Sequence, residues 1–326
     1  MKRRLIYIAL VALTIGLFLL SLQIGILHLH TSIFSLIGKS NSVDATTVWD
    51  VRFPRALGAV VIGAALGIAG ALAQGVFRNP LAEPTLIGLT SGATFGTILG
   101  IASGFAGYGS AWNCVAATLG TGVAAVITQF LAPNKNFSFL LTGIAFSSIL
   151  TSISGMVISI SGKPGIQSLS FWNFGSLSLI NFSTVLIVAP FISLGTILAF
   201  ALSRGLNVWS LGENSAFYLG LNIRRFRLLA IIAIALLIGP AVSAVGSIAF
   251  LGLLVPHLVR LVVGPDHRHL LALSGILGAL VLLIADLLAR AAFQPHELPL
   301  GLLTSILGAP ILIILLRTRR AQWVSE

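Results

Sequence analysis

Residues 63–88 read GAALGIAGALAQGVFRNPLAEPTLIG, an apolar, glycine-rich half followed by a polar half with two prolines. The first half carries small residues at helical spacing. Gly63 and Gly67 form a GxxxG pair, and Gly70 continues the same surface. Such spacing lets helix backbones approach closely in a membrane, where lipid offers no hydrophobic drive for association. We therefore predict a membrane helix that packs tightly against its neighbours.

The second half of the stretch interrupts this helix with a polar corner. Asn79-Pro80 and Glu83-Pro84 cannot continue a regular helix, because each proline removes a backbone donor and restricts the residue before it. Polar, broken backbone at membrane depth is tolerated only where protein or a water-filled cavity surrounds it. The corner is therefore a candidate for a transport path, and an ordinary loop between two spans is the alternative interpretation.

Composition places the whole chain in a membrane. Of its 326 residues, 57% are hydrophobic and only 8% are charged, and the mean hydropathy is +1.05. Soluble proteins carry about 25% charged residues. The single cysteine, Cys114, excludes an intrachain disulfide and a cysteine-based metal site. The sequence lacks the phosphate-binding GxxxxGK[ST], HExxH and GxSxG motifs, so we predict no catalytic residues, no metal site and no ATP site in this chain.

Ten apolar stretches follow one another along the chain. A span needs about 20 apolar residues, and shorter spans are tolerated inside a bundle. The expected helices cover residues 5–27, 53–75, 86–106, 112–132, 139–160, 183–203, 228–246, 248–262, 270–290 and 300–316. The loops between them are mostly short. We predict an all-α polytopic membrane protein of ten transmembrane helices that form one domain, residues 1–326.

The basic residues predict the orientation in the membrane. With the N-terminus in the cytoplasm, fourteen of the 19 Lys and Arg residues fall on the cytoplasmic side and the other five on the outer side. This is the positive-inside bias of membrane proteins. The net charge of +11 therefore indicates topology rather than a nucleic-acid partner. Both termini are expected in the cytoplasm, and the run 5–27 is too long for the apolar region of a signal peptide, about 7–15 residues.

The longest cytoplasmic segment, from about residue 204 to 227, predicts a short docking helix. Glu213 to Leu219 can form two helical turns, which Gly220 ends as the residue after the C-cap. Asn222 can then cap the next helix. A short helix held between two spans suits the binding of a soluble partner, and a solvated loop with an incidental helical turn is the alternative.

Charged residues near the outer ends of the spans form a second candidate site. Asp286 and Arg290 are four residues apart on one helix and are expected to pair. Arg52 and Arg55, with Arg290, can offer guanidiniums to the carboxylates of a partner in bidentate fashion. Snorkelling to lipid phosphates is the alternative. At the inner side, His267 and its neighbours lie in a short loop, where we expect them in solvent.

Several motifs together resemble one family of membrane proteins. Residues 63–88 resemble the FecCD-type permease subunits of type II ABC importers for iron complexes and vitamin B12. The shared pattern is G-A-x-L-x-x-x-G-x-x-x-Q-x-x-x-x-N-P-L-A-x-P-x-x-x-G. Further matches lie, in the family's order, at residues 52–55, 211–220, 246–260, 266–268, 285–290 and 297–310. The resemblance covers nearly the whole chain and implies the ten-helix fold of these permeases.

The resemblance also implies partners and site residues. Two permeases, as two copies or as two different chains, would pair around a central path, each holding one of two cytoplasmic ATPase subunits that bind ATP and Mg. The ATPase-coupling residues would be Leu211, Gly212, Glu213, Ala216, Leu219 and Gly220. A periplasmic or lipoprotein substrate-binding protein would dock on Arg52, Arg55 and Arg290. The path and its gate would include Gln74, Asn79, Pro80, Leu81, Asn136 and Phe137.

The resulting hypothesis is an importer permease of the bacterial inner membrane. It would translocate haem or a ferric siderophore by alternating access, with no cofactor of its own and with ATP hydrolysed by the separate subunit. A cobalamin importer of the same family is one alternative. A proton-coupled secondary transporter is another, and it would need a coupling-ion site among broken helices. A membrane enzyme would need a convergent polar site, which we do not find in the sequence.

Overall fold

A computed structural model describes residues 2–25, 43–131, 136–161, 173–292 and 296–323, with the side chains of 136–140 and 312–323 excepted. Helices dominate these ranges, and the described residues form no strand. The long helices are α1 (Lys2–Gln23), α3 (Phe53–Val76), α4 (Leu89–Ala102), α5 (Ala111–Leu131), α6 (Asn136–Ile160), α9 (Phe182–Ala201), α12 (Ile223–Val245), α13 (Leu251–Val263), α14 (His267–Ala291) and α15 (Leu300–Trp323). The short ones are α2 (Val43–Thr46), the π-helix η2 (Thr47–Arg52), α10 (Ser203–Trp209) and α11 (Glu213–Tyr218).

Each of the ten predicted spans coincides with one of the long helices. Seven helical stretches in the described residues are long and apolar enough to cross a membrane. The apolar helices α4, α13 and 300–311 of α15 are shorter than the others. The chain is thus a multi-pass, all-helical membrane protein, while the count of ten transmembrane helices stays a prediction.

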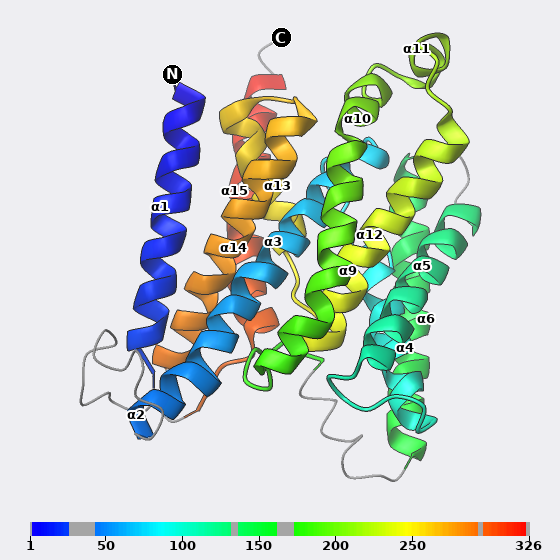
Figure 1. The fold of residues 1–326 in the computed structure, drawn as a ribbon. Coiled ribbons are helices and arrows are strands. Elements are labelled where there is room, and N and C mark those ends of the chain that lie inside the picture. The colour runs from blue at the N-terminus through cyan, green and yellow to red at the C-terminus, as the bar shows by residue number, and fades with distance from the viewer. Residues whose placement is uncertain (1, 26–42, 132–135, 162–172, 293–295, 324–326) are drawn as a thin grey trace.

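Helix α3 runs through the middle of the bundle (Figure 1) and contacts α1, α9, α12, α13 and α14. It continues η2 without a break, and Pro54, which has no N–H to donate, lies where the helix changes from the π to the α pattern. From residue 65 to its end at Val76, every residue of α3 is buried. A second group, in which α5 and α6 pack on α4, lies beyond α12.

The predicted small-residue surface is the contact between α3 and its partners. An ideal Cβ built on Gly63 would lie 2.5 Å from the carbonyl oxygen of Gly278 on α14. The same construction on Gly70 would place the Cβ 1.8 Å from the carbonyl oxygen of Gly252 on α13. Only glycine permits these backbone-to-backbone approaches, so the prediction of tight packing is confirmed.

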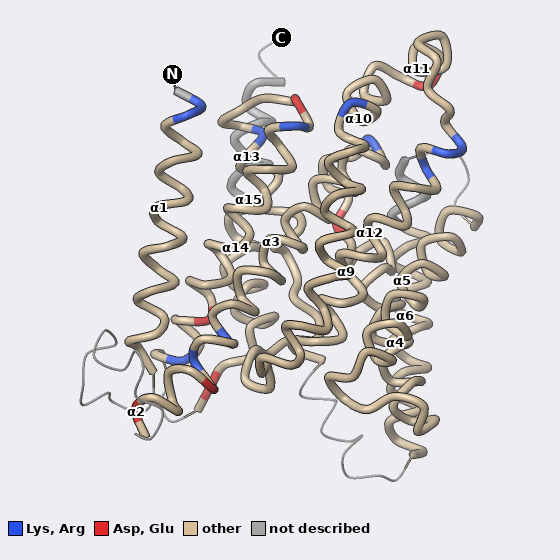
Figure 2. The backbone as a smooth tube through the Cα atoms, in the orientation of Figure 1, with Lys and Arg blue, Asp and Glu red and all other residues tan. Residues whose placement is uncertain are grey.

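The two ends of the bundle differ in the charge of their residues. Helix α1 begins, and α15 ends, at the same end of the bundle as α10 and α11 (Figure 1). Figure 2 shows basic residues spread over this end and a compact cluster of both signs at the other end. The two helical termini therefore lie on one side, and that this side is the cytoplasm stays a prediction from the positive-inside bias.

Replacing Gly70 by alanine should destabilise the protein, because the added methyl group meets the carbonyl of Gly252 and must push α13 away from α3. Overpacking of this kind costs about 1–3 kcal/mol. We expect a lower apparent melting temperature in detergent. The control is Gly16→Ala in α1, where a Cβ meets nothing within 4 Å and stability should not fall. Equal melting temperatures for both variants would contradict this account of the packing.

Candidate functional site

The short helix that we predict for docking is present at the end of the bundle where α1 begins, which is the inner end in the predicted topology. Helix α11 spans Glu213–Tyr218, and Gly212 and Gly220 flank it with φ values of 107° and 81°. These values lie in the region that glycine adopts without strain. Within the helix, Ala216 is fully buried against the rest of the protein, whereas Leu211 and Leu219, which flank the helix, are more than 60% exposed. The prediction of a short helix that begins at Glu213, with Gly220 as the residue after the C-cap, is confirmed, and its role in coupling stays a prediction.

Two aromatic residues enlarge this exposed apolar surface. Phe217 and Tyr218 are 68% and 85% exposed, and the sequence analysis did not single them out. The sequence feature that could have indicated their exposure is their position next to Ala216 in a helix of only two turns, where one face is buried and the other is not. Behind the helix, the Asn222 side chain accepts a 3.0 Å hydrogen bond from the backbone N–H of Arg225, so the predicted cap of α12 is confirmed. Exposed apolar side chains at the tip of a segment anchored in this way suit a protein partner.

The polar corner after α3, residues 77–88, is non-helical, as predicted at Asn79-Pro80 and Glu83-Pro84. It also includes residues 86–88, which were expected in the next helix, because α4 begins only at Leu89. The Asn79 side chain accepts a 2.9 Å hydrogen bond from the N–H of Leu81, which closes a tight turn around Pro80. Gln74 is buried just before the corner and donates to the Leu253 carbonyl of α13 over 3.2 Å. Gln74 thus braces α3 against α13, while Asn79, Pro80 and Leu81 form the turn itself.

A buried carboxylate ties the corner to α13, and the sequence analysis did not weigh it as a functional group. Glu83 is 3% exposed and accepts a hydrogen bond from the backbone N–H of Phe250, just before α13 begins. Phe250 adopts a left-handed conformation, with φ at 66°. An acidic residue beside a proline in an apolar stretch was the available signal. The corner is therefore fixed from both sides, by Glu83 and by Gln74.

Helix α10 is clamped to the start of α14 by one side chain. Asn207 donates to Asp266 Oδ1 over 2.8 Å, and its own oxygen lies 2.9 Å from the backbone nitrogen and 2.8 Å from Nδ1 of His267. The bond from Asn207, with the backbone N–H of Arg268, lowers the pKa of the Asp266 carboxyl from its ordinary value. The expectation of a solvent-exposed His267 is wrong. Its side chain is 4% exposed, because α10 folds over it.

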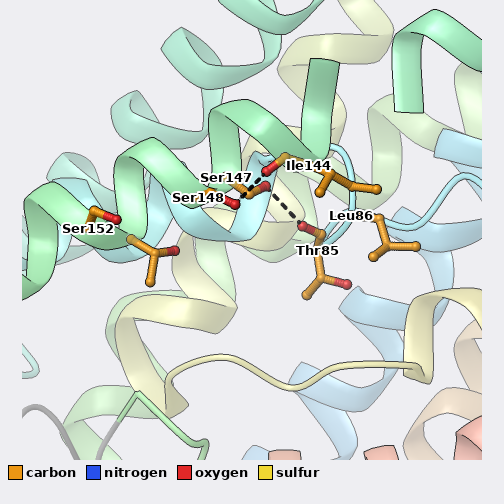
Figure 3. Close-up of a pocket in the computed structure, with 7 residues that line it drawn as sticks. Thr85, Leu86, Ile144, Ser147, Ser148 and Ser152 are labelled. Carbon is orange, nitrogen blue, oxygen red and sulfur yellow. Dashed lines mark hydrogen bonds between the residues drawn. The ribbon is translucent and has the colours of Figure 1, made fainter. Parts of the chain in front are cut away.

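Hydroxyl side chains line two adjoining pockets between the corner, α4 and α6. The first, an open pocket of about 390 Å³ (Figure 3), is lined by Thr85, Leu86, Ile144, Ser147, Ser148, Thr151 and Ser152. The second, of about 270 Å³, is lined by Thr85, Thr90, Ser91, Thr94, Thr151, Ser154, Asn173, Ser247 and Ala249. Thr85 and Thr151 belong to both. None of the described residues in either lining is charged, and in Figure 3 the Ser147 hydroxyl reaches the Thr85 carbonyl over 3.4 Å.

The sequence analysis missed this hydroxyl surface, although the run SSILTSIS at residues 147–154 signals it. The predicted gate residues Asn136 and Phe137 lie at the start of α6, where the side chains are outside the described residues. Their role stays a prediction. The groups of His, Cys, Asp and Glu in the described part of the chain include none that is suited to hold a metal ion.

The three outer arginines are buried rather than displayed. Arg52, Arg55 and Arg290 are 4%, 7% and 4% exposed. Arg52 donates to the carbonyls of Leu22 and Gln23 at the end of α1, over 3.0 and 2.6 Å. Free guanidiniums at the surface, which the docking prediction assumed, are therefore not what the structure presents. The docking role itself stays a prediction.

Arg55 and Arg290 share the fully buried carboxylate of Asp286. Nε and Nη2 of Arg55 both lie 2.8 Å from Asp286 Oδ1, and Nη1 lies 2.8 Å from Glu297 Oε1. Nη2 of Arg290 lies 3.0 Å from Asp286 Oδ2, close enough for an ion pair but without hydrogen-bond geometry. The predicted pairing of Asp286 with Arg290 is thus confirmed. We call Arg55, Asp286, Arg290 and Glu297 the outer charge cluster.

The outer charge cluster also reaches α1. Arg290 donates to the hydroxyl of Ser21 over 2.8 Å and to the carbonyl of Ile24 over 3.1 Å. Two guanidiniums therefore hold together the ends of α1, α3 and α14 on this side, and that of Arg55 also binds Glu297, which lies just before α15. Two cations and two anions balance, which is the condition under which buried charges are tolerated.

A broken, braced corner, a hydroxyl-lined surface within a helical bundle and a short exposed helix at one end are features that suit a membrane transport protein. Residues 8–318 match the model of the FecCD transport family. The chain belongs to that family and is an ABC importer permease.

Known relatives agree with this assignment. The chain is 38% identical to the hemin transport system permease protein HmuU of Yersinia pestis, over 97% of this chain and 95% of the relative. It is also 38% identical to the ferric enterobactin transport system permease protein FepD of Escherichia coli, over 92% and 91% of the two chains. A solved structure, described as an inward-facing conformation of a metal-chelate type ABC transporter, superposes with a TM-score of 0.84 at 30% identity, over 97% of this chain and 99% of that one.

Replacing Asp286 by asparagine should destabilise the protein strongly, because two buried guanidiniums would lose the anion that they share. Breaking a buried pair costs about 3–5 kcal/mol. Thermal unfolding in detergent measures the effect. The control is Glu297→Gln, since Glu297 is partly exposed and Arg55 keeps Asp286. A smaller loss for Asp286→Asn than for Glu297→Gln would contradict the central place of Asp286 in the outer charge cluster.

Proposed function

We propose that this permease moves an iron complex, haem or a ferric siderophore, across the bacterial inner membrane by alternating access. A separate ATPase that binds ATP and Mg supplies the energy. The observation that carries the proposal is the uncharged, hydroxyl-lined surface beside the proline-broken corner. Hydroxyl groups offer weak, exchangeable hydrogen bonds, so a bulky complex can pass without being held by a charge or coordinated through its metal.

The exposed face of α6 supports a paired permease. In the most apolar window of α6, only 17% of the residues are buried in this chain. Helix α1 is even less covered, with 11% of its window buried, and both helices expose many apolar residues. Helix α6 differs because it also exposes four hydroxyl residues, Ser148, Thr151, Ser152 and Ser159. Hydroxyls at membrane depth favour contact with protein or water over contact with lipid. A second permease, identical or different, placed opposite α6 would enclose the two pockets as one path.

The inner end of the bundle supports an ATPase partner. The coupling residues of the proposal are Leu211, Gly212, Glu213, Ala216, Leu219 and Gly220, and the exposed Phe217 and Tyr218 add to them. ATP binding by two such partners would move the α11 segments and shift the permease between inward-open and outward-open states. The inner gate would be formed by Gln74 at the end of α3, by Asn79, Pro80 and Leu81 in the corner, and by Asn136 and Phe137 at the start of α6.

At the outer end, docking of a substrate-binding protein would have to exchange ion-pair partners. Glu297 is the most exposed member of the outer charge cluster, with 27% of its side chain accessible. A carboxylate of the binding protein would replace Glu297 on Arg55, while Asp286 keeps both arginines paired. Arg52 would have to release the end of α1 in the same way. Docking at Arg52, Arg55 and Arg290 is thus proposed as an exchange rather than as contact with free charges.

Uptake into proteoliposomes that contain the permease, its ATPase and its binding protein tests the proposal. Labelled haem, a ferric siderophore and cobalamin are supplied outside, with or without ATP inside. ATP-dependent uptake of haem or siderophore is expected. Uptake of cobalamin alone would support the other substrate of the family. Uptake that ignores ATP and follows an imposed proton gradient would replace the proposal by secondary transport.

Replacing Gly220 by valine should uncouple ATP hydrolysis from uptake. Valine is strained at φ of 81°, at a cost of about 1–3 kcal/mol, so the end of α11 must shift. We expect at least a ten-fold lower uptake per ATP hydrolysed, with hydrolysis retained. The matched control is Gly104→Val between α4 and α5, where φ is 78° and the space around the residue is equally open. The same uptake per ATP in both variants would refute the coupling role.

A further inference from the structure

One buried tryptophan connects the docking segment, by which we mean α10 and α11 (residues 203–218), to the polar corner. Trp209, the last residue of α10, is 1% exposed. Its indole N–H donates a 2.8 Å hydrogen bond to the carbonyl of Val76, the last residue of α3. Val76 directly precedes the corner, residues 77–88. The end of α10 and the end of α3 are therefore joined at one atom pair, although 133 residues separate them in the sequence.

Two arginines and an aromatic ring surround the same indole. The guanidinium carbon of Arg78 lies 4.6 Å from the ring centroid, and that of Arg227 lies 5.0 Å from it. The ring of Phe226 on α12 packs at a centroid distance of 6.0 Å. Contacts of cations with a tryptophan face are attractive at these distances. Trp209 is thus the shared partner of α3, the corner and α12.

The two arginines extend the connection in opposite directions. Arg227 lies 3.7 Å from the carboxylate of Glu213, the first residue of α11. Arg78 stands within the corner with φ at 47°, a left-handed conformation that non-glycine residues seldom adopt. Strained backbone persists only where the surroundings hold it, and here Trp209 supplies part of that support. A continuous series of contacts therefore runs from α11 through Arg227 and Trp209 to Arg78 and Val76.

We propose that Trp209 is the positioning residue that transmits movement of the docking segment to the gate corner. The inference rests on the proposed function for the roles of α11 and of the corner. A second attachment restrains α10 itself: Asn207 joins the middle of α10 to the start of α14. A push on α11 then cannot be absorbed by rotation of α10 alone, and it reaches the end of α3 through Val76.

The test replaces Trp209 by phenylalanine, which keeps an aromatic ring but removes the N–H donor. The permease is reconstituted with its ATPase and its binding protein. Uptake per ATP hydrolysed is measured, together with the ATP-induced change in amide exchange at residues 77–88. The control is Trp112→Phe in α5, the same chemical change at a site that is 57% exposed. Thermal unfolding of both variants reports on the fold.

We expect Trp209→Phe to hydrolyse ATP at the wild-type rate, with uptake per ATP lower by about five-fold, the factor that one lost hydrogen bond supplies. The exchange response at residues 77–88 should be lost, and Trp112→Phe should match the wild type in every measurement.

If Trp209→Phe keeps the wild-type exchange response or uptake ratio, the inference is overturned. It is also overturned if hydrolysis and uptake fall together with stability, since Trp209 would then only support the fold. Absence of ATP-dependent uptake in the wild type would instead overturn the proposed function, and the exchange response would still decide the role of Trp209.

Discussion

The contact between the backbones of α3, α13 and α14 is the constraint on which the rest of the structure depends. Glycines let these helices meet at distances that exclude any side chain. In lipid, where apolar burial does not favour one helix partner over another, such packing supplies much of the association energy. Because α3 is held in this way along its length, its two ends can carry the polar features that the membrane otherwise disfavours.

Polar groups at membrane depth are bonded differently at the two ends of α3. At the outer end, Arg55 is neutralised by Asp286 and Glu297, so charge is balanced within the chain. At the inner end, the corner bonds its own backbone through Asn79, whose side chain accepts from the N–H of Leu81 and whose carbonyl accepts from the N–H of Ala82. The surrounding elements are tied to it by Trp209, which bonds the end of α3, and by Glu83, which bonds the backbone before α13. The first arrangement fixes helices to one another, and the second fixes a turn to a segment that faces the cytoplasm in the predicted topology. The difference suits a permease in which the inner end responds to a partner.

Features that depend on neighbouring residues could be predicted from the sequence. The helix at Glu213, the cap at Asn222 and the i,i+4 pair of Asp286 and Arg290 are all local patterns, and the structure confirms them. The glycine surface of α3 could be predicted as well, since small-residue spacing is itself a packing signal. The shared motifs indicated the family, which the match over residues 8–318 confirms.

Features that depend on distant partners could not be predicted in this way. Arg55 was expected at the surface, but its partners Asp286 and Glu297 lie more than 230 residues away, and burial follows from them. His267 was placed in solvent because nothing local indicates that Asn207 covers it. Trp209 and the pocket hydroxyls were missed because a single tryptophan and scattered serines gain meaning only when the helices are assembled.

In the mechanism that we propose, α10 and α11 move together with the part of the corner that follows Val76. Pairs of spin labels on introduced cysteines test it directly, because the single native cysteine, Cys114, is buried. One pair joins Ser215 on α11 to Pro80 in the corner, and the second joins Ser215 to Ser148 on α6. Each distance is measured by pulsed electron resonance in the complex, with and without trapped ATP. We expect the first distance to stay unchanged and the second to shift when ATP is trapped. If the first distance changes as much as the second, α11 and the corner do not move together.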